Sequence, residues 1–128
     1  MAKKTQRVLS IESDVRDYQT ICAALKGLPL EIIRAASGAE ALEFLAREMP
    51  PLILLDIDLP DMRGWDIIEK YKSDERLRSA RVVVLTAQSS PVHRLIGSLQ
   101  DAVVGYLTKP IAPARLLEIV RWALELDA

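Results

Sequence analysis

Two patterns of apolar residues alternate along the chain. Short apolar runs bounded by proline, glycine or polar turn residues are typical of strands buried on both faces, and apolar residues spaced three and four apart indicate helices with one buried face. The clearest run is LILLD at 52–56, because prolines stand at 50, 51 and 60. The patterns predict strands at 7–11, 30–35, 52–56, 82–85 and 105–107. They predict helices at 15–25, 38–49, 65–73, 91–100 and 113–126, with a polar connection at 73–81.

The alternation of strands and helices predicts the fold class. A strand, a helix and a second parallel strand form a right-handed unit, so five strands alternating with five helices predict an α/β fold. We expect a doubly wound, five-stranded parallel sheet with helices on both faces. The 128 residues suit a single domain, which we place at 1–128. In such sheets ligands bind outside the carboxyl ends of the strands, so the side chains at those ends are candidates for chemistry.

Composition excludes several classes of function. The 17 basic and 18 acidic residues nearly cancel, so we expect no direct nucleic-acid partner. Cys22 is the single cysteine, which excludes a disulfide framework and a cysteine-based metal site. No apolar run approaches the ~18 residues of a membrane span, and no apolar stretch follows the basic N-terminus as it would in a signal peptide. We therefore expect a cytoplasmic protein that does not contact the membrane.

The predicted strand ends carry polar side chains that suit one another. Glu12-Ser13-Asp14 follows the first strand, Asp56 ends the third, Thr86 ends the fourth and Lys109 follows the fifth. A carboxylate can attack phosphorus and form an acyl phosphate. A divalent cation such as Mg²⁺ binds oxygen ligands, and an ammonium and a hydroxyl can hold the oxygens of the transferred group. The four strand ends together therefore indicate phosphoryl chemistry.

Four segments resemble the receiver domain of two-component response regulators: VLSIESD at 8–14, LILLDIDLPDMRG at 52–64, VVVLTA at 82–87 and GYLTKP at 105–110. The resemblance covers essentially the whole chain. It implies a flavodoxin-like sheet with strand order 2-1-3-4-5. It also implies that Asp56 is the phosphoacceptor, that Lys109 and Thr86 act in phosphotransfer, and that Thr86 and the aromatic Tyr106 form the switch.

The resemblance implies a Mg²⁺ site with one departure from the family pattern. Glu12, the Asp56 carboxylate and the backbone carbonyl of Asp58 would bind the ion. Receivers usually carry two adjacent acids after the first strand, and here Ser13 stands in the second place. Either Glu12 reaches over, or Asp14 moves in, or the site is weak, with Ser13 as a neutral ligand. Because a hydroxyl is a poorer ligand for Mg²⁺ than a carboxylate, we expect weak binding.

The resemblance also implies partners and a tuned phosphoryl lifetime. A histidine kinase or a phosphotransfer protein would supply the phosphoryl group. An output protein or a second copy of the chain would bind the face formed by 91–126. Asp58 and Gln88 occupy the two positions that tune the lifetime of the acyl phosphate in this family.

Two other functions compete with the phosphoacceptor. A degenerate receiver that is not phosphorylated would serve only as a protein-binding module, and Ser13 supports it. An aspartyl-phosphate phosphatase is more remote. Asp56-Ile57-Asp58 resembles the nucleophile motif of haloacid-dehalogenase phosphatases, but it follows the third strand rather than the first, and Pro60 replaces the usual Thr or Val. We expect no enzyme activity beyond self-catalysed phosphotransfer and autodephosphorylation.

Overall fold

The structure is a computed structural model that describes residues 5–87 and 102–126. Strand β1 (Gln6–Ile11) leads into helix α1 (Val15–Leu25), followed by β2 (Leu30–Ala35) and α2 (Gly38–Arg47). Strand β3 (Leu52–Asp56) precedes α3 (Gly64–Tyr71) and a short 3₁₀ helix (Glu75–Ser79). The chain continues with β4 (Arg81–Thr86), β5 (Val103–Thr108) and α5 (Pro113–Ala123). No helix in these two ranges is long and apolar enough to cross a membrane.

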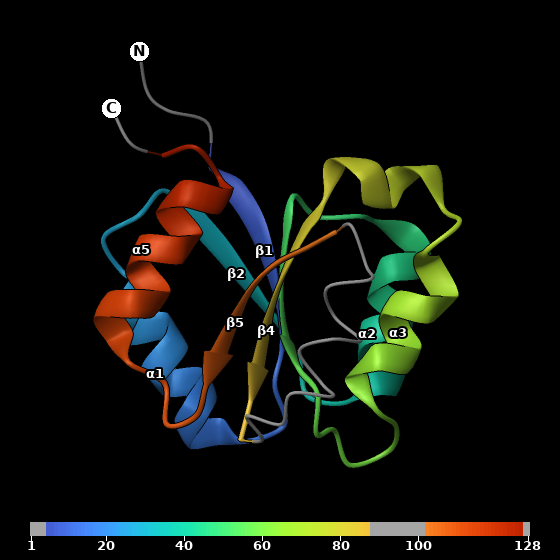
Figure 1. The fold of residues 1–128 in the computed structure, drawn as a ribbon, viewed down its shortest axis with the longest axis horizontal. Coiled ribbons are helices and arrows are strands. Elements are labelled where there is room, and N and C mark those ends of the chain that lie inside the picture. The colour runs from blue at the N-terminus through green and yellow to red at the C-terminus, as the bar shows by residue number, and fades with distance from the viewer. Residues whose placement is uncertain (1–4, 88–101, 127–128) are drawn as a thin grey trace.

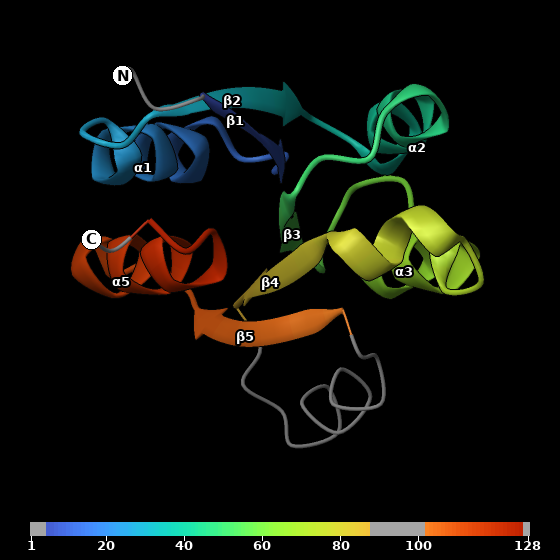
Figure 2. The ribbon, with the colours of Figure 1, turned by 90° about the horizontal axis from the view of Figure 1, so that it is seen from above.

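All five strands pair in parallel, in the order β2-β1-β3-β4-β5. The sheet order and fold class expected from the sequence are therefore confirmed. Helices α1 and α5 cover one face of the sheet, and α2 and α3 cover the other (Figures 1 and 2). Every residue of the central strand β3 is buried, because helices pack against both faces.

Local chemistry explains where the helices begin. The Asp14 carboxylate accepts a hydrogen bond from the backbone N–H of Asp17 at 3.0 Å and caps α1. The Ser37 hydroxyl accepts one from the N–H of Glu40 at 3.2 Å and caps α2. Such caps satisfy backbone donors that have no partner inside the helix. Pro113 begins α5, where its missing N–H costs no hydrogen bond.

Some predicted bounds differ from the observed ones. The strands at 82–85 and 105–107 extend to Arg81–Thr86 and Val103–Thr108. The helices predicted to end at 49, 73 and 126 end at Arg47, Tyr71 and Ala123. The connection at 73–81 contains the 3₁₀ helix, which is capped by Asp74 and buries Leu77. The predicted helix at 91–100 lies outside the described residues, which contain four α-helices.

Candidate functional site

The carboxyl ends of four strands meet at one edge of the sheet. Ile11 of β1 pairs with Leu55 of β3, one residue before Glu12 and Asp56. Further along the same edge, Asp56 pairs with Leu85, and Thr86 pairs with Thr108. Parallel pairing therefore brings together Glu12, Asp56, Thr86 and Lys109, which the sequence singled out separately.

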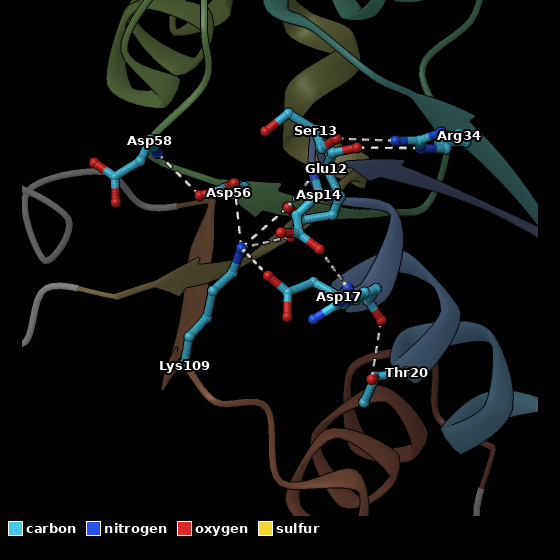
Figure 3. A network of polar contacts seen from close by, with 10 residues as sticks. Glu12, Ser13, Asp14, Asp17, Thr20, Arg34, Asp56, Asp58 and Lys109 are labelled. Carbon is cyan, nitrogen blue, oxygen red and sulfur yellow. Dashed lines mark hydrogen bonds and ion pairs between the residues drawn. The ribbon is translucent and has the colours of Figure 1, made fainter.

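The Lys109 ammonium lies at the centre of three carboxylates. Its Nζ is 2.9 Å from Oε1 of Glu12, 2.9 Å from Oδ2 of Asp17 and 3.3 Å from Oδ2 of Asp56. It also donates a hydrogen bond to Oε2 of Glu12 at 3.0 Å. Figure 3 shows the lysine side chain reaching across the strand ends towards these acids. The backbone N–H of Lys109 donates to the carbonyl of Thr86 at 2.8 Å, which fixes the start of this side chain.

Burial makes the charges of this cluster interact strongly. Glu12 is fully buried, and the Asp56 side chain is 4% exposed. Burial raises the pKa of Glu12 to about 7, although the hydrogen bond from Lys109 opposes the rise. Burial lowers the pKa of Lys109, but hydrogen bonds to Asp17 and Glu12 outweigh it, so the net pKa lies above its usual value. Lys109 is therefore a permanent cation, whereas Glu12 is poised to change charge near neutral pH.

The loop after β3 orients the Asp56 carboxylate. Its Oδ1 accepts a hydrogen bond from the backbone N–H of Asp58 at 2.9 Å, while Oδ2 faces Lys109. The Asp58 side chain is exposed and points away from Lys109 (Figure 3). The N–H of Gly64 donates to the carbonyl of Ile57 at 2.8 Å and closes the loop. A Cβ at Gly64 would lie 2.8 Å from the backbone oxygen of Asp56, so only glycine fits without moving the site.

An arginine from β2 supports the loop between β1 and α1. Arg34 donates hydrogen bonds to the backbone carbonyls of Glu12 at 3.2 Å and Ser13 at 3.1 Å. Its guanidinium also lies over the ring of Tyr18, 5.2 Å from the centroid. Figure 3 shows it on the far side of this loop from Lys109. Arg34 was not singled out in the sequence, because nothing local indicates which backbone it would reach.

Among the acids near Ser13, the structure distinguishes those that join the cluster. Glu12 joins it, because both of its carboxylate oxygens lie close to Lys109 Nζ. Asp14 lies outside the cluster, where its carboxylate is exposed and caps α1. Asp17 also joins the cluster, although no sequence motif pointed to it. The available signal was its place in the first turn of α1, where side chains lean back towards the helix N-terminus and so towards the end of β1.

The oxygen donors suit a hard cation. Mg²⁺ is usually bound through one or two carboxylates and retains several waters, so Glu12 and Asp56 are a sufficient pair. Oε1 of Glu12 is buried, and no group in the described ranges donates it a well-aligned hydrogen bond, although Lys109 Nζ is close. The same ranges contain no group of three or more His, Cys, Asp and Glu side chains arranged as ligands of one ion. The pair thus fits Mg²⁺ with a minimal donor set.

The predicted switch residues, Thr86 and Tyr106, lie on the neighbouring strands β4 and β5. Thr86 is buried at the end of β4. Tyr106 on β5 is half-buried, pairs in register with Val84 and packs against Trp65, with ring centroids 6.4 Å apart. Gln88 lies outside the described residues. The functional roles assigned to these side chains stay predictions.

Comparison with known proteins identifies relatives for nearly the whole chain. Response regulator PleD of Caulobacter vibrioides is 32% identical over 125 residues, which cover 94% of this chain but only 27% of PleD. The polar-differentiation response regulator DivK of Brucella ovis is 30% identical over 119 residues, which cover 91% of this chain and 94% of DivK. The chain therefore spans about a quarter of one relative and nearly all of the other.

Solved structures show the same architecture. A CheY-like response regulator receiver domain protein from Methanospirillum hungatei JF-1 matches with 27% identity and a TM-score of 0.83, covering 96% of each chain. The Mn²⁺-bound form of response regulator Rcp1 matches with 26% identity and a TM-score of 0.83, covering 96% of this chain and 97% of that one. The family model for the response regulator receiver domain matches residues 8–121. With sheet order, strand-end chemistry and relatives in agreement, this chain belongs to the response regulator receiver domain family.

Proposed function

We propose that this chain is a phosphoacceptor switch in which Asp56 receives a phosphoryl group from a histidine kinase or a phosphotransfer protein. One observation carries the proposal. The Asp56 carboxylate stands at the carboxyl edge of the sheet, held by the Asp58 N–H on one oxygen and facing the Lys109 ammonium with the other. An oriented carboxylate beside a fixed cation suits attack on a phosphoryl group, whose transfer depends mainly on positioning and charge stabilisation.

The chemical step needs little from the protein beyond this arrangement. An oxygen of Asp56 forms a bond to phosphorus while the bond between phosphorus and the donor's imidazole nitrogen breaks, and the electron pair stays on that nitrogen. Lys109 donates to the oxygens of the transferred group, and the Thr86 hydroxyl supplies a second donor at the end of β4. Mg²⁺, held by Glu12, Asp56 and the backbone carbonyl of Asp58, would neutralise the charge of the phosphoryl oxygens. Turnover is limited to self-catalysed transfer and later hydrolysis by water, and by the family resemblance Asp58 and Gln88 tune the rate of that hydrolysis.

The signal would leave through β5 and α5. A phosphoryl group on Asp56 gives the Thr86 hydroxyl a new acceptor, and movement of Thr86 changes the space next to Tyr106. The surface that β5 and α5 present then changes, and an output protein or a second copy of the chain binds there. The protein would exist in an inactive and an active conformation, and the phosphoryl group favours the active one only as far as it interacts more strongly with that conformation. We place these events in the cytoplasm.

Intact-mass measurement tests the acceptor directly. After incubation with acetyl phosphate and MgCl₂, the wild-type mass should rise by one phosphoryl group, and Asp56→Asn should abolish the rise. Asp66→Asn is the matched control, because it removes an exposed carboxylate from α3, just after the same loop. Phosphorylation of the Asp56→Asn variant would show that another residue is the acceptor.

A second function is favoured by Ser13, which removes an acid from the metal site. In that alternative the chain is a degenerate receiver that binds a protein partner without being phosphorylated. An unmodified wild-type mass at saturating donor and MgCl₂ would support it and would refute the phosphoacceptor. Hydrolysis of a generic phosphate ester would instead support the more remote phosphatase.

A further inference from the structure

Asp17 belongs to the site, yet neither the sequence motifs nor the family resemblance assigns it a role. Its Oδ2 lies 2.9 Å from Lys109 Nζ, closer than the 3.3 Å that separates Nζ from Oδ2 of Asp56. Its side chain is 28% exposed, so the carboxylate lies at the rim of the cluster, where water can reach it. It therefore contacts the buried charges without being enclosed by them.

The first turn of α1 directs this side chain. Asp14 caps the helix by accepting a hydrogen bond from the backbone N–H of Asp17. Asp17 is thus the third residue of the helix, and its side chain leans towards the helix N-terminus and the end of β1. The two acids therefore have different contacts: Asp14 caps α1, and the Asp17 side chain points to the strand ends.

The charge of the cluster points to what Asp17 does there. When ionised, Glu12, Asp17 and Asp56 carry three negative charges against the single positive charge of Lys109, a net charge that one divalent cation would balance. Without Asp17 the net negative charge of the cluster would be halved, because Ser13 carries no charge. Independently, Oε1 of Glu12 is buried 2.9 Å from Lys109 Nζ and accepts no well-aligned hydrogen bond from the described ranges, so the cluster contains an oxygen that a ligand would satisfy.

We propose that Asp17 supplies to the Mg²⁺ site the carboxylate that Ser13 lacks, from one turn further along the chain. The inference rests on the proposed function only in taking Mg²⁺ as the ion that this edge of the sheet binds. Since Mg²⁺ retains several of its waters, Asp17 can act through one of them from the rim. Some residues do not touch the metal but hold its ligands or its bound waters. Loss of such a residue commonly weakens metal affinity 10- to 100-fold.

Titration with MgCl₂ alone, by isothermal calorimetry at pH 8 and without any phosphoryl donor, tests this assignment. Asp17→Asn should raise the Mg²⁺ dissociation constant about tenfold. Asp14→Asn is the matched control, because it removes the same charge three residues earlier while asparagine keeps the cap. It should change the constant less than twofold. Equal effects of the two substitutions, or no effect of Asp17→Asn, would overturn the proposal.

A double-mutant cycle makes the assignment specific. Ser13→Asp restores an acid at the position that lacks one, so it should tighten binding more in the Asp17→Asn background than in the wild type. Equal tightening in both backgrounds would show that the two positions act independently and would refute the compensation. Urea unfolding of each variant checks that it is folded. Because no donor is present, failure here is separate from failure of Asp56 to accept a phosphoryl group, which the mass measurement reports.

Discussion

Replacing the buried Glu12 by glutamine should remove a specific pH dependence from the stability of the protein. Its carboxyl has a pKa of about 7 in the folded state, against 4.5 when it is not perturbed, chiefly because the side chain is buried. A carboxyl with a raised pKa binds its proton more tightly in the folded state than in the unfolded one. Its stabilising contribution is therefore complete below pH 4.5 and is lost as the pH rises through 7.

The size of this effect follows from the two pKa values. Between pH 5 and pH 8, loss of the Glu12 proton should lower the free energy of unfolding by about 2.5 kcal/mol. Each unit of pKa difference corresponds to about 1.4 kcal/mol, and this pH range covers most of the difference between the folded and unfolded pKa values. Glutamine has nearly the same shape and does not titrate, so Glu12→Gln should lack this decrease. Subtracting the variant from the wild type cancels the groups that titrate equally in both proteins.

Urea unfolding followed by circular dichroism, at half-unit steps from pH 5 to 8 and with EDTA present, measures the difference. EDTA is needed because a bound divalent cation would favour the ionised carboxylate and hide the decrease. Saturating MgCl₂ should shrink the decrease for the same reason. A wild-type-minus-variant difference that stays constant, or that grows with pH, would contradict the account of Glu12 as a buried acid with a raised pKa.

Two further predictions concern the glycine beside the acceptor and the route of the signal. Gly64→Ala should cost about 2–3 kcal/mol by urea unfolding, because its Cβ would press against the backbone of Asp56 and Ile57. Gly27→Ala, which meets nothing within 4 Å, should be neutral or stabilise by up to about 1 kcal/mol; similar losses in both would refute the steric argument. Thr86→Ala should still be phosphorylated in the mass assay but should show reduced chemical-shift changes at Tyr106 and along α5. Full wild-type changes in that variant would rule out the threonine as the link.

The sequence by itself determined the elements and the fold class. Apolar runs such as 52–56 and the prolines around them are local signals, and strands buried on both faces have few alternatives to a parallel sheet covered by helices. The positions of the strand ends then predicted a meeting of four side chains: Glu12, Asp56, Thr86 and Lys109. Parallel strands place their carboxyl ends at one edge, so knowing where each strand ends is enough to predict that the residues at those ends converge there.

Tertiary structure alone decided how the side chains share the charge. Glu12 and Lys109 are 97 residues apart, and the sequence could predict that they meet but not that one ammonium would bind three carboxylates. Asp14 and Asp17 are both acids at the start of α1, yet one caps α1 and the other reaches Lys109. The physical reason is that a helix fixes the direction of each side chain only relative to its own axis. What lies in that direction depends on how α1 packs against the sheet and where β5 delivers its lysine.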